Sequence, residues 1–195
     1  VNYRAQKPVL KDGFQELNVL LGSNRNFTEF DQRVCWVAEK EYTNGSWGYI
    51  GGYAFRPKSN KTTLPAAEIN ILDSDNAPIY QTQRRAVEAF KADVPDGKYS
   101  VYLHWAELIK TKEEALAYNL GRNSQYDEMS SRSFGVVVNG QTIFENLDVF
   151  EEVGGARPYV VKVDVVVENG EGINIALNPV EGETMLTAVR IIKMD

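Results

Sequence analysis

Apolar and polar residues alternate along several short stretches of the chain, as they do in strands that bury one face. The clearest stretch is Tyr159–Val167, whose odd-numbered positions are all apolar or aromatic, with Lys162 and Asp164 between them. Short apolar runs predict further strands at residues 16–22, 34–37, 79–83, 90–94, 98–108 and 186–193. Because these segments are short and separated by turn residues, they predict an all-β protein.

Asparagine–glycine pairs predict where the chain turns back on itself. Asn139-Gly140 divides residues 133–144 into the two strands of a hairpin, because a type I′ turn needs positive φ at both central residues. Asn169-Gly170 follows the alternating strand, and Glu171-Gly172 completes the turn. We therefore expect the next strand, at residues 173–177, to pair with residues 159–167.

One segment has the features of a helix. Thr111 and Glu114 form a capping box, and Gly121 is suited to end a helix over residues 111–120. This helix belongs to a polar segment, residues 110–131, which we expect to be a surface insertion between two strands. Many short strands and one short helical insertion predict a jelly-roll-like β-sandwich that forms a single domain over residues 1–195.

The composition narrows the range of partners. The chain has 195 residues, of which 43% are hydrophobic and 25% charged, and its net charge is −6. An acidic chain without clusters of lysine and arginine argues against nucleic acid or an anionic membrane surface as partner. It also has no apolar run of about 18 residues, so the sequence predicts no membrane span.

Few residues are suited to catalysis or metal binding. One histidine, His104, and one cysteine, Cys35, exclude a zinc site built from several such ligands. We expect His104 to be a core or semi-buried histidine rather than a catalytic base, and Cys35 to be a small buried side chain. The chain has no nucleophile elbow, P-loop or dinucleotide-binding motif. Residues 73–76 (DSDN) lack the glycine and distal glutamate of a calcium loop and predict a turn. We expect no cofactor, and a structural calcium ion is not indicated.

Residues 42–53 (YTNGSWGYIGGY) contain four glycines and four large aromatic residues. One interpretation is a tight corner whose rings cap the sandwich. The other is a glycine-rich loop that holds its rings out as a platform for the apolar face of a sugar. Under the second interpretation the indole face of Trp47 would be accessible to solvent, and Tyr49 would behave in the same way.

Several segments resemble, in the same order, malectin and the bacterial malectin-like carbohydrate-binding domains. They are residues 17–22, Ser46-Trp47-Gly48-Tyr49, Tyr80-Gln81-Thr82-Gln83-Arg84, residues 97–107, residues 134–140 and Leu147-Asp148-Val149-Phe150. Together they cover nearly the whole chain. The insertion at residues 110–131 and the GSWGYIGG sequence are similar to malectin-like modules attached to bacterial family 2 glycoside hydrolases such as β-galactosidases.

This resemblance implies a galactose-binding-like sandwich that binds carbohydrate through aromatic residues and an acid on loops at one end. The residues at corresponding positions are Trp36, Trp47, Tyr49, Phe90 and Glu183. It also implies a non-catalytic accessory domain in a periplasmic or extracellular protein, with a catalytic domain of the same parent chain as a second partner.

Two other functions stay open at this point. The domain could be a structural module that packs on a catalytic domain and binds no sugar. It could also be a glycosidase, which needs two carboxylates about 5–10 Å apart across a cleft. Glu107 and Asp148 are the acids nearest to the matching segments.

Overall fold

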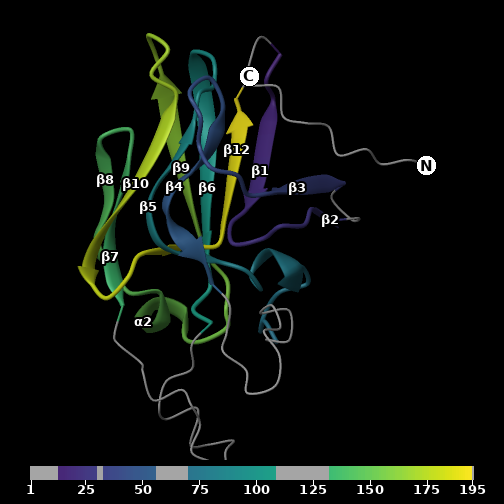
Figure 1. Cartoon of the computed structure of the whole chain (residues 1–195), viewed down its shortest axis with the longest axis vertical. Coiled ribbons are helices and arrows are strands. Elements are labelled where there is room, and N and C mark those ends of the chain that lie inside the picture. The colour runs from purple at the N-terminus through teal and green to yellow at the C-terminus, as the bar shows by residue number, and fades with distance from the viewer. Residues whose placement is uncertain (1–12, 30–32, 56–69, 109–131, 195) are drawn as a thin grey trace, which may run out of the picture.

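The computed structural model describes residues 13–29, 33–55, 70–108 and 132–194, in which two β-sheets pack face to face (Figure 1). In sheet order, the first contains β2 (Phe27–Glu29), β3 (Val34–Ala38), β1 (Glu16–Leu20), β12 (Ala188–Lys193), β6 (Gly97–Trp105) and β9 (Tyr159–Val167). The second contains β11 (Met185–Leu186), β5 (Arg84–Ala92), β10 (Ile173–Glu181), β7 (Ser133–Val138) and β8 (Gln141–Leu147), with β4 (Trp47–Ala54) paired to β5. The predicted all-β sandwich is confirmed.

The core lies between the two sheets. From β6, the side chains of Tyr99, Val101, Leu103 and Trp105 enter it, and all four are completely buried. Alternating apolar residues of β7 and β10 meet them from the second sheet. Each buried side chain of this size stabilises the fold by roughly 1.5–3 kcal/mol, so the alternation seen in the sequence is what holds the sheets together.

The predicted hairpin at residues 133–144 is confirmed as β7 and β8. Asn139 and Gly140 have φ angles of 44° and 81°, as a type I′ turn requires. The side chain of Asn139 also reaches the neighbouring strand: its Nδ2 donates to the Gly172 carbonyl at 2.8 Å, and its Oδ1 accepts from the Asn174 amide at 2.8 Å. The turn therefore fixes the beginning of β10.

The predicted pairing of residues 159–167 with residues 173–177 is wrong. β9 pairs with β6 along its whole length, whereas β10 lies in the other sheet between β5 and β7. The turn at Asn169-Gly170 thus carries the chain from one sheet to the other. The physical reason is the contact of Asn139 with Gly172 and Asn174, which draws the second strand to the β7–β8 hairpin.

Two other local predictions need correction. Residues 79–83 are no strand: Ile79 ends the short 3₁₀ helix η2 (Ala77–Ile79), which contains Pro78, and β5 starts only at Arg84. The strand predicted at 90–94 overlaps the end of β5. Most of the expected loop at residues 42–53 is a strand, because β4 runs from Trp47 to Ala54. The β4–β5 register shifts between Ile50 and Gly51, and a Cβ at the following Gly52 would stand 2.2 Å from the Arg85 carbonyl oxygen. Only glycine permits so close a backbone approach.

The short helix α2 (Val149–Val153) was not predicted. Asp148 caps it, because its carboxylate accepts hydrogen bonds from the Phe150 and Glu151 amides at 2.9 and 3.2 Å. Asp148 and Glu151 have the spacing of a capping box, which is the signal that could have revealed this helix. The helix predicted at residues 111–120, and the insertion at 110–131 to which it belongs, lie outside the described residues.

His104 lies in a second, smaller apolar cluster behind the first sheet. Its side chain is 9% exposed, its Nδ1 is 3.0 Å from the Tyr80 hydroxyl, and the edge of Trp36 packs against its ring. Burial and the nearby positive charge of Arg190 lower the pKa of His104 to about 4. The prediction of a buried histidine is confirmed. Cys35, expected to be buried, is half-buried on β3.

Candidate functional site

Three of the five predicted binding residues are buried. Trp36, Trp47 and Phe90 are exposed by only 1%, 6% and 0%. Trp47 packs on Phe90 in the main core, with ring centroids 6.5 Å apart, while the Trp36 indole donates to Glu29 in the smaller cluster at 3.1 Å. The expected accessible indole face of Trp47 is therefore wrong. None of these three rings can stack on a sugar in this conformation.

The burial of Trp47 follows from the pairing of β4. Trp47 stands opposite Ala92 of β5, so it occupies an ordinary strand position rather than the tip of a loop. Tyr49, two positions on, is half-buried and also packs against the core. One face of its ring is covered by the Arg84 guanidinium, whose central carbon lies 3.1 Å from the ring centroid. Tyr49 therefore supports the fold and offers little free ring surface.

Glu183, the predicted acid, is exposed and lies beside an exposed ring. The hydroxyl of Tyr53 donates a hydrogen bond to the Glu183 carboxylate at 2.7 Å, and Tyr53 is 47% exposed. Burial and this hydrogen bond to Glu183 raise the pKa of the Tyr53 phenol. The phenol thus stays protonated and donates to the carboxylate at neutral pH. Tyr53 was not predicted, although it ends the aromatic and glycine-rich segment that was singled out.

Two buried arginines lie next to this pair. Arg85 stands opposite Tyr53 in the β4–β5 register, and its guanidinium lies 3.6 Å above the ring of Phe55. Its Nη2 is 3.9 Å from Oε1 of the buried Glu107, and Nε of Arg132 is 3.6 Å from Oε2 of the same carboxylate. Burial, reinforced by the positive charge of Arg132, lowers the pKa of Arg85 to about 10, which still leaves it charged at neutral pH.

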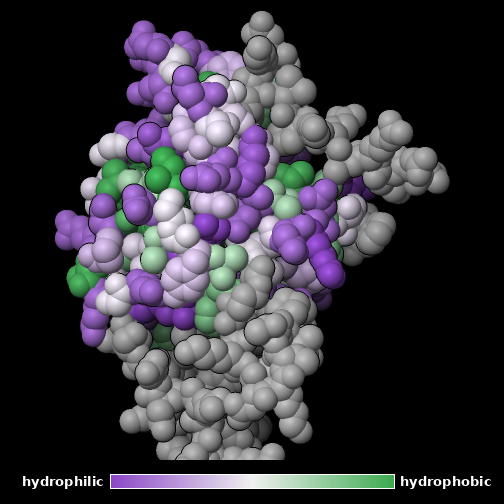
Figure 2. Space-filling view, in the orientation of Figure 1, coloured by the Kyte–Doolittle hydropathy of each residue, from purple (hydrophilic) through white to green (hydrophobic). Residues whose placement is uncertain are grey.

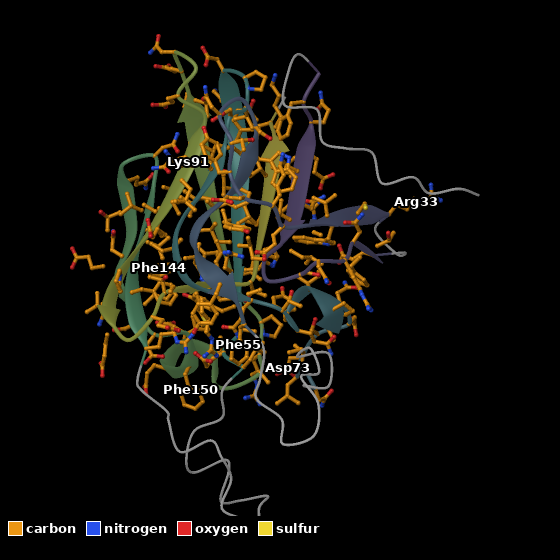
Figure 3. All side chains as sticks on the ribbon, viewed as in Figure 1. Arg33, Phe55, Asp73, Lys91, Phe144 and Phe150 are labelled. Atoms are coloured by element: carbon orange, nitrogen blue, oxygen red, sulfur yellow. The ribbon has the colours of Figure 1, made fainter. Side chains whose placement is uncertain are left out.

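We refer to Tyr53, Phe55, Arg85, Glu107, Arg132 and Glu183 as the end cluster. Its members come from the end of β4, the start of β5, the segment after β6, the residue before β7 and the segment before β11. Figure 3 shows Phe55 toward the same end of the sandwich as Phe150 of α2. Pairing of the strands that flank these segments brings them to the same end of the sandwich.

Backbone hydrogen bonds hold the end cluster in place. Thr184 is buried, its hydroxyl donates to the Val87 carbonyl, and its own carbonyl accepts from the Ala86 amide at 2.9 Å, which fixes the position of Glu183. The carbonyl of Glu107 accepts from the Ala156 amide at 2.7 Å. The charged side chains therefore project from an anchored backbone, as a binding site requires.

The two acids named for a hydrolase both have structural partners. Glu107 faces Arg85 and Arg132, and Asp148 caps α2. A turn was predicted at residues 73–76; the structure has a turn at residues 72–73 and a bend at residue 75, and Asp73 pairs with Arg157 at 3.0 Å. Among the described residues, no group of three or more His, Cys, Asp or Glu side chains is arranged to hold a metal ion. In the same part of the chain, no helix is long and apolar enough to cross a membrane.

Comparison with known proteins relates this sandwich to a family. Receptor-like protein 4 of Arabidopsis thaliana is 24% identical over 171 residues, which is 80% of this chain and 25% of that protein. Malectin-B of Xenopus laevis is 24% identical over 96 residues, which is 48% of this chain and 29% of that protein. The chain thus spans about a quarter of the length of these curated relatives.

Solved structures share the fold. Bacteroides uniformis β-glucuronidase superposes with a TM-score of 0.73 and 24% identity, over 92% of this chain and 18% of that one. The ANX1 ectodomain from Arabidopsis thaliana superposes with a TM-score of 0.61 and 16% identity, over 92% of this chain and 48% of that one. In both cases the matching fold is one part of a longer chain.

The family model of the malectin domain matches residues 18–195, which is nearly the whole chain. The two packed sheets agree with the β-sandwich that the resemblance implied. The chain therefore belongs to the malectin family of carbohydrate-binding domains.

Proposed function

We propose that this chain is a non-catalytic carbohydrate-binding module, one domain over residues 1–195, and that sugar binds at the end cluster. The observation that carries this proposal is the pairing of an exposed ring with a carboxylate, Tyr53 with Glu183, at 2.7 Å. The C–H face of a pyranose can stack on such a ring. A carboxylate that accepts one hydrogen bond keeps further lone pairs for sugar hydroxyls.

The proposed site differs from the one expected from the sequence in its aromatic residue but contains the same acid. Glu183 stays in the proposed site, while Tyr53 takes the role that the sequence suggested for Trp47. The two residues are six positions apart in β4, but Trp47 lies in the core and Tyr53 lies next to solvent. Tyr49, half-buried under Arg84, supports the strand that carries Tyr53.

We further propose that the parent protein is a bacterial glycoside hydrolase of the β-galactosidase type, located in the periplasm or outside the cell. Support comes from the fold likeness to part of a bacterial β-glucuronidase, of which the matched region is 18%. In such a chain the catalytic domain would be the second partner of this module, and the module would hold the enzyme near its carbohydrate.

A structural module held permanently on a catalytic domain would need a contact patch with a contiguous apolar centre. The large apolar side chains exposed in the described part of the chain are dispersed over several elements, namely Tyr53, Leu72, Val160, Val166 and Val180. The face seen in Figure 2 is largely hydrophilic, with separate apolar patches. These observations favour sugar binding over a structural role.

Replacing Tyr53 with alanine should weaken sugar binding by about 1–3 kcal/mol, the contribution of one well-packed aromatic contact. Calorimetric titration against a panel of galactosides, glucosides, uronic acids and plant polysaccharides measures this effect. Tyr102→Ala is the matched control, because Tyr102 is a half-buried tyrosine on β6, outside the end cluster. Equal affinities of wild type and Tyr53→Ala would contradict the proposed site. The absence of binding to any sugar at millimolar concentration would contradict the function.

A further inference from the structure

Two buried arginines in the end cluster have hydrogen-bond donors without acceptors. Arg85 and Arg132 are only 6% and 8% exposed. Within the described part of the chain, Nη2 of Arg85 and both Nε and Nη1 of Arg132 have no hydrogen-bond partner, and neither has Nε2 of the fully buried Gln83. Buried polar groups are nearly always hydrogen-bonded, because an unmade bond leaves the cost of desolvation uncompensated. The unpartnered donors therefore need an explanation.

The neighbouring arginine shows what a purely structural arginine looks like in this fold. Arg84 donates from Nε to the Gly51 carbonyl at 2.8 Å, from Nη1 to Glu39 at 2.7 Å and from Nη2 to the Gly52 carbonyl at 3.0 Å. Arg85, one residue on, makes a single side-chain hydrogen bond to the residues that the structure describes, from Nε to Gln83 at 3.3 Å. Groups around the β4–β5 strand pair therefore accept hydrogen bonds from all three nitrogens of the Arg84 guanidinium. The Arg85 guanidinium keeps a donor that a ligand could use.

The charges around these donors favour an anion. Glu107 lies between the two guanidiniums at 3.9 and 3.6 Å, so both contacts exceed hydrogen-bond length. Glu107 balances only one of the two guanidiniums, and the next described carboxylate that acts on Arg85 is Glu183, which is hydrogen-bonded to Tyr53 at the exposed edge of the cluster. The positive charge of Arg132 opposes that of Arg85, which adds to burial in lowering the Arg85 pKa. A bound anion would relieve this repulsion and accept the free hydrogen bonds.

We propose that the end cluster binds a hexuronate, with the sugar carboxylate held by Arg85 and Arg132 and the ring placed against Tyr53. This inference deepens the proposed function and rests on it. A planar carboxylate matches the fork geometry of guanidinium donors. The exposed Tyr53 ring and the Glu183 carboxylate beside the arginines suit a sugar ring and its hydroxyls, and Glu183 would repel a second carboxylate. Both features favour a uronic acid over an acidic peptide.

The test compares sugars that differ only in the group at carbon six. Glucuronic and galacturonic acid are titrated beside glucose and galactose, at constant pH and ionic strength. We expect each uronate to bind at least tenfold more tightly than its neutral counterpart. Arg132→Met should bring this ratio to about one. Lys98→Met should leave the ratio unchanged, because it removes the same charge from an exposed position at the opposite end of β6.

The titrations distinguish failure of the hexuronate proposal from failure of the proposed function. Equal binding of uronates and neutral sugars by the wild type overturns the hexuronate proposal and leaves the proposed function standing. If no sugar binds, the proposed function fails as well. Competition by acetate or by an acidic peptide, each at the concentration of the uronate, would show a general anion site and overturn the assignment to a sugar. The ratio of uronate affinity to neutral-sugar affinity in the wild-type protein tests the hexuronate proposal even if Arg132→Met fails to fold.

Discussion

Replacing Trp47 with alanine should lower the free energy of unfolding by about 3–5 kcal/mol, because it leaves a large cavity in the core. Trp47 is 6% exposed and packs against Phe90, and Lys40 Nζ lies 4.6 Å from the centroid of its ring. Urea denaturation measures the change. Tyr53→Ala, in the same strand but at an exposed position, is the control and should change stability much less.

Sugar titration of the Trp47→Ala variant completes this test. The fraction that remains folded should bind sugar with the affinity of the wild type, because the indole does not reach the end cluster. A change in stability below 1 kcal/mol together with loss of sugar binding would contradict the structure. Such a result would restore Trp47 to the site suggested by the sequence.

Lowering the pH from 7 to 5 should reduce the free energy of unfolding by about 2 kcal/mol through His104 alone. The pKa of His104 is about 4 in the folded protein, against an ordinary 6.5, because burial and Arg190 disfavour the imidazolium. The unfolded chain therefore binds the proton first. The stabilisation is fully present above pH 6.5, falls between pH 6.5 and 4, and totals about 3 kcal/mol.

His104→Asn provides the comparison, since the asparagine amide can still meet the Tyr80 hydroxyl near the position of Nδ1. The chain has one histidine, so no other imidazole contributes. Denaturation curves of this variant should show little pH dependence between pH 7 and 5. A wild-type protein with equal stability at both pH values would show that His104 is not shielded from solvent.

Elements defined by local pattern were predictable from the sequence. Tyr159–Val167 matches β9 at both ends because five apolar residues alternate without interruption. Asn139-Gly140 located the β7–β8 turn because few other residue pairs accept positive φ twice. Pairing between distant segments was not predictable: β10 joins β5 and β7 through contacts that no local pattern reveals.

The same limit applies to the candidate site. Glycine and aromatic residues in segment 42–53 are compatible with an exposed loop, and only the pairing of β4 with β5 shows that Trp47 is buried and Tyr53 exposed. Glu183 came from the family resemblance and lies in the end cluster. Arg85 and Arg132 were missed, although Arg84-Arg85 at the start of a stretch rich in apolar residues was a visible signal. Charged residues buried in a strand usually have a specific partner.

The most direct test of sugar binding at the end cluster is a ¹H–¹⁵N NMR titration of the chain with the best-binding sugar of the panel. We expect the amide shifts to change mainly at residues 53–55, at Arg85 and at residues 183–184, and the Trp47 indole signal to stay in place. Changes centred on the Trp47 indole, or on the turns at Asn139-Gly140 and Asn169-Gly170, would contradict this expectation.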